Sequence, residues 1–371
     1  MRRFVCLLLT LLLLLPITLT AHATSPAPNV SAASYVLMDA TSGTLLADKD
    51  AHMRRPMAST TKIMTALVVL ETLPLDTVVT VPREAVGIEG SSIYLYEGEQ
   101  ITVQTLLYAL MLSSANDAAV ALAIACDGSV AAFATRMNEK AAALELTNTH
   151  FCNPNGLHEA EHYTTAFDLA RLTCAALANE TFASIVQTKR YTAAQSGTDA
   201  TRLFLNHNRL LRTLDGAVGV KTGFTRAAGR CLVSATQREG LTLVAVTLNA
   251  PDDWRDHTTL HDWGHERFSV FSPDVSPISL PVVGGDTNEV ILVPANAPRV
   301  LIEAEAEVKC TRYLPPFLYG GIEAGERCGT LRYTLDGTLL CEVSLVAQST
   351  VAAERKASLP YRILQFLKRM F

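Results

Sequence analysis

Residues Pro56–Leu70 read PMASTTKIMTALVVL, and the apolar run from Ile63 to Leu70 predicts a buried helix that begins close behind the proline. Residues three apart lie one above the other on a helix, so this spacing puts the Ser59 hydroxyl within reach of the Lys62 amine. A hydroxyl needs an adjacent base to act as a nucleophile, and a lysine can be that base only where burial or a second cation lowers its pKa. The segment therefore predicts an activated serine, with a helix cap beside a surface lysine as the alternative.

Length and composition are those of an ordered globular protein. The chain has 371 residues, of which 49% are hydrophobic and 18% charged. These values predict about two domains once targeting segments are removed. The net charge of −5 gives no reason to expect nucleic acid as a partner, because nucleic-acid binding usually requires a basic patch.

The first residues have the pattern of a secretory signal peptide. Arg2 and Arg3 precede an apolar run from Phe4 to about Leu19, and Ala21-His22-Ala23 is a small-x-small cleavage site. We expect residues 1–23 to be a signal peptide cut after Ala23, with an uncleaved anchor as the alternative. Either form places the protein outside the cytoplasmic membrane.

The order of elements after the linker of residues 24–33 predicts an α/β domain over residues 34–272. An early strand hairpin, a helical region and late strands argue for helices packed on an antiparallel sheet. Within the helical region, Thr165 and Asp168 predict a capping box. The expected elements are strands at Ser34–Met38 and Thr44–Ala47, helical pattern from Ser59 to about Ala178, strands at Ala217–Lys221, Arg230–Thr236 and Leu241–Leu248, and a helix from about Thr258 to Phe268.

A small β domain is expected over residues 273–350, followed by an amphipathic helix over residues 351–371. Prolines 273, 277 and 281 mark the boundary, and a turn is predicted at Asp336-Gly337. The last segment is too short to span a bilayer and fits a helix lying in the membrane interface; a helix docked on the protein itself is the alternative. The expected β strands are Glu289–Val293, Val300–Val308, Gly329–Leu335 and Leu339–Val346; the apolar face of the final helix would hold Leu359, Ile363, Leu364, Phe366, Leu367 and Met370.

Two further short motifs follow the serine and lysine in chain order. Ser114-Ala115-Asn116 follows the apolar helix expected from Leu106 to Leu112, and Lys221-Thr222-Gly223 ends an expected strand. Taken alone, Ser114-Ala115-Asn116 is better interpreted as a simple turn. The three motifs together, on a helix start, an interhelix turn and a strand, are not readily explained by chance.

With these motifs the chain resembles the penicillin-recognising serine enzymes, and within them the D-alanyl-D-alanine carboxypeptidases of the low-molecular-mass penicillin-binding proteins. The resemblance covers about Ser34 to Phe268 and includes Asn153-Pro-Asn-Gly-Leu157 and Tyr163-Thr-Thr-Ala-Phe-Asp-Leu-Ala170. It implies a β-lactamase/transpeptidase-like domain. It also implies that Ser59 is the nucleophile, that Lys62 is its base, and that β-lactams acylate the serine.

The resemblance assigns the other motif residues to substrate and proton handling. Ser114 would relay a proton to the leaving D-Ala, and Asn116 would form hydrogen bonds with the peptide backbone and with Lys62. Lys221 would lower the pKa of Lys62 and attract the substrate carboxylate. The remaining substrate-binding residues would be Thr222, Gly223, Phe224, whose backbone N–H forms the oxyanion hole with that of Ser59, and Arg255.

A competing zinc motif lies at His158-Glu159-Ala160-Glu161-His162. Two histidines one helical turn apart with an adjacent glutamate match the zincin pattern. We interpret the run as a loop, because it follows Asn155-Gly156 and precedes a separate capped helix. Histidines 257, 261 and 265 recur at helical spacing and are interpreted as a solvated helix face. Cys126, Cys174 and Cys231 are expected to be buried thiols, while a bridge among Cys310, Cys328 and Cys341 is left open.

The predicted function is a membrane-attached serine carboxypeptidase that removes the terminal D-Ala from peptidoglycan stem pentapeptides, without a metal or other cofactor. A serine β-lactamase is the first alternative, since it uses the same three motifs, but no Glu-x-x-x-Asn loop for deacylation is evident. A zinc metallopeptidase using His158, Glu159 and His162 is a remote alternative. A catalytically silent wall-binding protein is the third.

Overall fold

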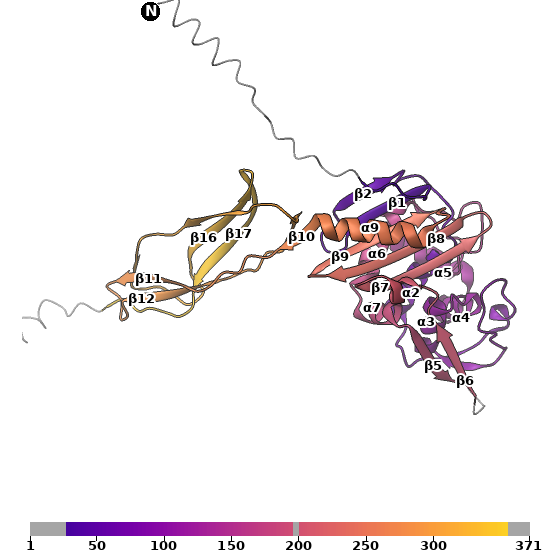
Figure 1. Ribbon diagram of the computed structural model, residues 1–371. Coiled ribbons are helices and arrows are strands. Elements are labelled where there is room, and N and C mark those ends of the chain that lie inside the picture. Colours follow the sequence, from indigo (N-terminus) through magenta and orange to yellow (C-terminus); the bar gives the residue numbers. More distant parts are fainter. Residues whose placement is uncertain (1–26, 196–199, 355–371) are drawn as a thin grey trace, which may run out of the picture.

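A five-stranded antiparallel sheet forms the centre of the larger part of the molecule (Figure 1). The computed structural model describes residues 27–195 and 200–354. The strand order is β2-β1-β9-β8-β7, so the early hairpin joins the late strands, as predicted. The strands are β1 (Ser34–Asp39), β2 (Leu45–Lys49), β7 (Ala217–Thr225), β8 (Gly229–Arg238) and β9 (Leu241–Leu248).

Helices cover both faces of this sheet, which confirms the predicted architecture. Successive side chains of a strand point to opposite faces. In β1, Val36 and Met38 join the main core beneath the helical layer, whereas Tyr35 and Leu37 join a second cluster with Leu260 of α9. The helices of the first layer are α2 (Lys62–Thr72), α3 (Val103–Leu112), α4 (Asn116–Asp127), α5 (Val130–Ala143), α6 (Ala166–Leu177) and α7 (Glu180–Gln187), and α9 (Asp253–Arg267) covers the other face.

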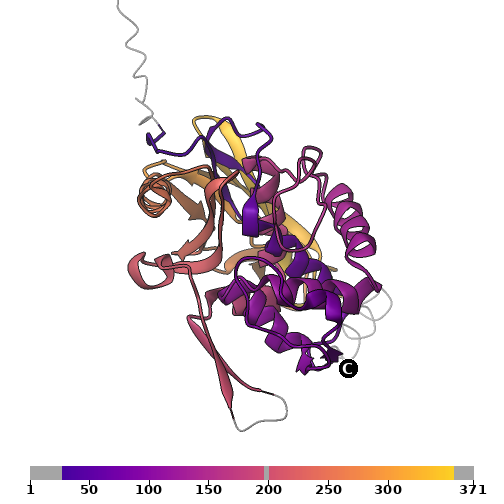
Figure 2. The same ribbon diagram turned by 90° about the vertical axis from the view of Figure 1, so that its right-hand side faces the viewer.

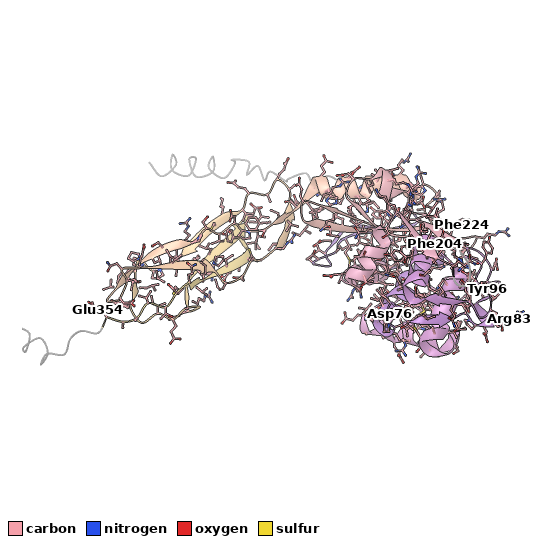
Figure 3. All side chains as sticks on the ribbon, turned by 90° about the horizontal axis from the view of Figure 1, so that it is seen from below. Asp76, Arg83, Tyr96, Phe204, Phe224 and Glu354 are labelled. Atoms are coloured by element: carbon pink, nitrogen blue, oxygen red, sulfur yellow. The ribbon has the colours of Figure 1, made fainter. Side chains whose placement is uncertain are left out.

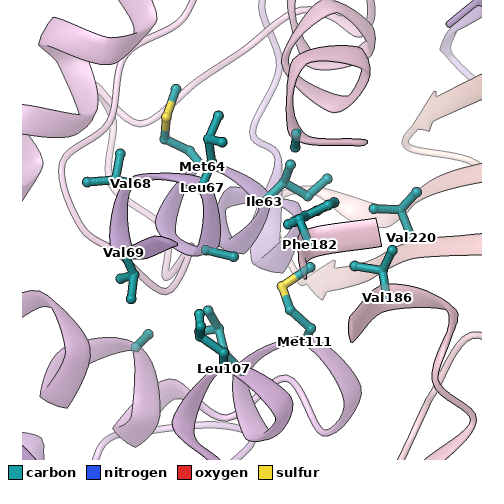
Figure 4. Packing of buried hydrophobic residues seen from close by; sticks show 14 of the residues in the cluster. Ile63, Met64, Leu67, Val68, Val69, Leu107, Met111, Phe182, Val186 and Val220 are labelled. Atoms are coloured by element: carbon teal, nitrogen blue, oxygen red, sulfur yellow. The ribbon is translucent and has the colours of Figure 1, made fainter. Parts of the chain in front are cut away.

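Helix α2 lies at the centre of the main core (Figure 4). Every residue from Ile63 to Val69 is buried, which explains why its sequence is apolar all round. Met111 of α3, Phe182 of α7 and Val220 of β7 pack around it. Each large side chain buried here contributes roughly 1.5–3 kcal/mol. The segment that carries Ser59 is therefore attached to a helix that is buried from Lys62 to Val69.

The region from Ser59 to Ala178 is less continuously helical than predicted. Residues between α2 and α3 include the strand pair β3 (Val78–Thr80) and β4 (Gln100–Thr102) and a short 3-10 turn at Arg83–Ala85. Thr165 caps α6 by accepting from the Asp168 N–H, at 3.0 Å. The Asp168 carboxylate instead accepts from Asn148 N and Thr149 Oγ1, so it serves the preceding loop rather than a reciprocal capping box.

A hairpin and a one-turn helix connect α7 to the sheet. Strands β5 (Arg190–Ala194) and β6 (Thr201–Leu205) form the hairpin, which projects from the body (Figure 2). The short helix α8 (Leu210–Thr213) leads into β7. Within the described residues no single helix is long and apolar enough to cross a membrane. Helices α4 and α5, whose axes are bent by 83° relative to each other, reach that length and composition only as a pair.

The histidines of α9 lie against the sheet, so their interpretation as a solvated face is wrong. His257 and His261 are fully buried because hydroxyl groups of β8 and β9 give them polar partners inside an otherwise apolar layer. Five hydrogen-bond distances of 2.6–2.9 Å link the side chains. This histidine ladder consists of, in order, Thr247, His257, Ser234, His261, Thr236 and His265.

The second part of the chain is a β structure with its own core, set apart from the first sheet (Figure 1). A two-stranded sheet pairs β10 (Phe268–Phe271) with β13 (Val300–Glu303), and a six-stranded sheet has the order β14-β16-β17-β12-β11-β15. The expected strand over 300–308 ends at Glu303. The strands of the larger sheet are β11 (Ile278–Val283), β12 (Glu289–Pro294), β14 (Lys309–Tyr313), β15 (Leu318–Tyr319), β16 (Arg327–Leu335) and β17 (Thr338–Ala347).

The predicted cysteine environments are confirmed in part. Cys231 is buried, whereas Cys126 and Cys174 are only partly buried. All seven cysteines of the described residues are free thiols. The expected signal peptide and nearly all of the expected C-terminal helix lie outside the described residues.

Candidate active site

The serine predicted as nucleophile lies on a short 3-10 turn in front of α2. This turn covers Ala58–Thr61, and α2 begins at Lys62. Ala58 has a φ of +50°, a left-handed conformation that an alanine rarely adopts. The hydroxyl of Thr61 donates to the Ala58 carbonyl at 2.9 Å, and that of Thr60 donates to the Met57 carbonyl at 2.6 Å. These bonds hold the Ser59 backbone in place.

Lys62 is fully buried, with its Nζ at the point where three polar groups converge. Nζ lies 3.0 Å from Ser59 Oγ, 2.7 Å from Asn116 Oδ1 and 2.6 Å from the Asn155 carbonyl oxygen. Burial, and then the charge of Lys221, lower the pKa of Lys62 well below its ordinary value. A neutral amine has two N–H groups, which match the Asn116 and Asn155 oxygens. Its lone pair is then directed at the Ser59 hydroxyl.

Asn116 is fixed from its other end. Its Nδ2 donates to the Glu89 carbonyl at 2.6 Å, which leaves Oδ1 facing Lys62. A Cβ on residue 90 would lie 2.8 Å from that same Nδ2, so the glycine there makes room for the amide. Ser114 precedes α4 with a φ of +60°, and its side chain lines the cleft in front of Ser59. The predicted interhelix motif therefore lies beside the serine and the lysine.

Strand β7 brings the third motif to the opposite side of the cleft. Lys221 is buried, and burial lowers its pKa to about 7. A Cβ at position 223 would lie 3.1 Å from the Ser59 nitrogen, so the strand can approach the turn this closely because residue 223 is glycine. The Thr222 and Phe224 side chains line the cleft, and Phe224 is exposed. The motif lies within the strand rather than at its end.

The cleft holds about 260 Å³ and includes residues that the sequence did not single out. His207 lines it, and burial and then the charge of Lys221 lower its pKa. Arg230 and Asp253 also line it; the guanidinium donates to Asp253 Oδ1 from Nε at 3.0 Å and from Nη2 at 2.8 Å. Arg230 faces Phe224 in the β7–β8 ladder. No sequence signal pointed to Arg230, because this pairing exists only in the folded sheet.

Arg255 is not among the residues that line the cleft. It lies in the first turn of α9 with a largely exposed side chain, paired with Asp252 at 3.3 Å. Among the described residues, Arg230 lines the same cleft as Thr222, whereas Arg255 does not. A larger cleft of about 880 Å³ lies at the far end of α9, among Arg238, Asp262 and His265.

Residues 158–162, which match the zincin pattern, form a loop, as predicted. One of their histidines contacts the Ala58–Thr61 turn that carries Ser59. The backbone N–H of Cys152 donates to His162 Nδ1 at 3.0 Å. Nε2 therefore carries the proton and donates to Thr61 Oγ1 at 2.7 Å. Burial is the main cause that lowers the pKa of His162 to about 4, in keeping with a neutral ring. Both nitrogens are engaged, so His162 has no free position for a metal.

The assembled groups can perform acyl transfer. The Ser59 hydroxyl contacts the buried Lys62 amine, and Phe224 and Arg230 line the same cleft as Ser59. Among residues 27–195 and 200–354, no group of three or more His, Cys, Asp or Glu could hold a metal ion.

Comparisons with known proteins agree with this geometry. Residues 20–252 match the family model described as D-alanyl-D-alanine carboxypeptidase. The chain is 30% identical to D-alanyl-D-alanine carboxypeptidase DacF of Bacillus subtilis, over 100% of this chain and 98% of that protein. It is 32% identical to D-alanyl-D-alanine carboxypeptidase DacC of Escherichia coli, over 92% and 89%. The crystal structure of penicillin binding protein 5 from Haemophilus influenzae superposes with a TM-score of 0.67 at 28% identity, covering 89% of this chain and 100% of that one.

Proposed function

Because this chain belongs to the D-alanyl-D-alanine carboxypeptidase family, we propose that it removes the terminal D-Ala from peptidoglycan stem peptides through an acyl-enzyme on Ser59. The 3.0 Å contact between Ser59 Oγ and the buried Lys62 Nζ carries the proposal. The two N–H groups of a neutral Lys62 have acceptors on Asn116 and Asn155, so its lone pair is available to the serine.

Acylation begins when Ser59 Oγ attacks the carbonyl carbon of the penultimate D-Ala and Lys62 takes the hydroxyl proton. The backbone N–H groups of Ser59 and Phe224 stabilise the negative oxygen that forms. When the peptide C–N bond breaks, the departing amine of the terminal D-Ala receives a proton from Lys62 through the Ser114 hydroxyl. Water then attacks the ester with Lys62 as its base, and the shortened peptide and free Ser59 are released.

The substrate's terminal carboxylate would lie on the β7 side of the cleft. Thr222 contributes a hydroxyl to the cleft, and Gly223 leaves room between the strand and the turn that carries Ser59. Lys221 is buried close enough to Lys62 for its charge to lower the pKa of that amine, and it would add a positive charge for the carboxylate. We propose Arg230, rather than Arg255, as the guanidinium that completes this side. Asp253 holds it through the bonds from Nε and Nη2, so its remaining N–H groups can meet a carboxylate.

The alternatives receive less support. β-Lactams would acylate Ser59 in a carboxypeptidase and in a β-lactamase alike, as substrate mimics. Membership of the D-alanyl-D-alanine carboxypeptidase family favours the carboxypeptidase. A zinc peptidase would need both histidines of the loop as ligands, and His162 is committed to Thr61 and Cys152.

The expected cellular position follows from the two termini. Relatives of this family are named for an activity on D-alanyl-D-alanine, which is chemistry of the cell wall. We propose that the signal peptide of residues 1–23 directs export. The amphipathic segment of residues 351–371 would then hold the enzyme on the outer face of the cytoplasmic membrane.

A peptide-hydrolysis assay tests the proposed reaction. The purified protein is incubated with a peptide ending in D-Ala-D-Ala, and free D-Ala is measured. Release that disappears in Ser59→Ala and persists with a metal chelator agrees with the proposal. Release that chelator abolishes and Ser59→Ala retains would rule it out.

A further inference from the structure

Three large apolar side chains form an exposed patch at one end of the six-stranded sheet. Val283 is 52% exposed, Phe317 39% and Tyr319 70%. Val283 and Tyr319 are paired in the parallel ladder of β11 and β15, so their side chains point to the same side. The rings of Phe317 and Tyr319 meet edge to face, with centroids 5.3 Å apart. We call these three residues the distal patch.

The distal patch lies on the outer face of the sheet. Its neighbours Val282 and Leu318 alternate with it along the strands and belong to the second core or pack against it. A strand whose inner face is buried usually carries polar residues on its outer face. Single exposed apolar residues are normal, but three adjacent ones indicate an interaction surface.

The distal patch lies where the described chain ends. The Glu354 N–H donates to the Gly284 carbonyl at 2.7 Å, and the Gly321 N–H donates to the Val351 carbonyl at 2.8 Å. A Cβ on residue 320 would overlap the Gly284 carbonyl, so the turns after Val283 and Tyr319 pack directly against each other. Figure 3 shows Glu354 at the end of the molecule remote from Phe224.

The residues that follow have the composition of a segment that binds an anionic membrane. Residues 355–371 contain five cations and no Asp or Glu. Anionic lipid attracts such a segment. Tyrosine favours the level of the lipid headgroups, and phenylalanine is typical of the apolar face that is buried at this interface. Asp286 and Glu323, which follow Val283 and Tyr319 by a few residues in the sequence, are exposed and acidic, so the contribution of the distal patch to binding is apolar rather than electrostatic.

We propose that the distal patch inserts into the same phospholipid surface that holds the C-terminal segment, as a second contact that fixes the orientation of the molecule. This inference rests on the proposed membrane attachment. With both contacts made, the sheet of the second part lies between the bilayer and the cleft of Ser59. The cleft then opens at a distance from the lipid.

A vesicle co-sedimentation experiment tests the inference. The protein without its signal peptide is mixed with vesicles of phosphatidylcholine and phosphatidylglycerol at low and high salt. The variant Val283→Ser/Phe317→Ser/Tyr319→Ser should bind about tenfold more weakly, by the apolar area removed, and the loss should persist at high salt. Leu339→Ser and Tyr96→Ser remove apolar side chains of similar exposure elsewhere and should bind like the wild type. Unchanged release of D-Ala from a soluble peptide shows that each variant is folded.

A protein truncated after Glu354 separates the two contacts. If truncation abolishes binding and the triple variant binds like the wild type, the distal patch is not a lipid contact and the inference is overturned. If the triple variant loses binding while truncation does not, the patch contact stands and the proposed C-terminal anchor fails. Equal losses in the triple variant and the two control variants would also overturn it.

Discussion

Acidification tests the histidine ladder of α9, because its imidazoles are buried in neutral form. Burial lowers the pKa of His257 to about 3. Burial, and then the repulsion that protonated His261 would meet from a protonated His257, lower the pKa of His261 well below its ordinary value. In the unfolded chain, His257 and His261 would each titrate with a pKa of about 6.5. A folded-state pKa below the unfolded one means that stability is complete above pH ~6.5 and falls as the pH drops below it.

The size of the effect follows from the depressed pKa values. Each pH unit below ~6.5 costs about 1.4 kcal/mol per neutral histidine until the folded-state pKa is reached. At pH ~5 the two histidines should therefore lower the free energy of unfolding by about 4 kcal/mol in total. His162, with its pKa lowered to about 4, should add about 2 kcal/mol. His265, whose pKa burial also lowers to about 4, should add less because its ring is only partly buried.

Denaturant unfolding at pH ~7.5 and ~5 measures this change, followed by tryptophan fluorescence. Both tryptophans of the chain, Trp254 and Trp263, lie in α9. The double variant His257→Gln/His261→Gln should lose only the part due to His162 and His265. Equal stability of the wild type at the two pH values would contradict the neutral state of the buried histidines. So would an NMR titration that places the ring of His257 or His261 near its ordinary pKa.

Three further outcomes are expected. Lys62→Ala should slow acylation by penicillin by about three orders of magnitude, measured by stopped flow, because the serine loses its base; a rate within tenfold of wild type would contradict that role. Arg230→Leu should reduce kcat/KM for a D-Ala-D-Ala peptide about 10- to 100-fold, while Arg255→Leu should leave it within twofold, and the reverse order would restore Arg255. Gly156→Ala should destabilise the protein by at least about 2 kcal/mol in denaturant unfolding, because a Cβ there would overlap the Ala58 carbonyl at a φ of +86°; unchanged stability would show that this contact is relaxed at little cost.

The sequence predicted the architecture well where periodicity was strong. The antiparallel sheet and the buried helix behind Ser59 follow from apolar runs and turn residues that act locally. Strand β11 was missed because Pro281, which lies within it, was interpreted as part of a boundary. A two-residue partner strand, β15, lies beside this segment of β11, and no local pattern shows such a partner.

The sequence predicted the site residues that belong to short motifs. It did not predict the residues that only tertiary contacts bring into the site. Spacing alone placed Ser59 next to Lys62, but only the fold adds the Asn155 carbonyl as a third partner of the amine. Arg230 enters the cleft because β8 pairs with β7, and the sequence has no means to rank it above Arg255. The ladder of α9 was misjudged because three histidines on one helix face are polar in sequence, while their hydroxyl partners lie on other strands.

Mass spectrometry of the protein after brief exposure to penicillin is the sharpest test of Ser59 as the nucleophile. We predict one penicilloyl adduct, on the peptide that contains Ser59, which persists for minutes and is absent from Ser59→Ala. An adduct on another residue, or labelling that survives in Ser59→Ala, would contradict the assignment of the nucleophile.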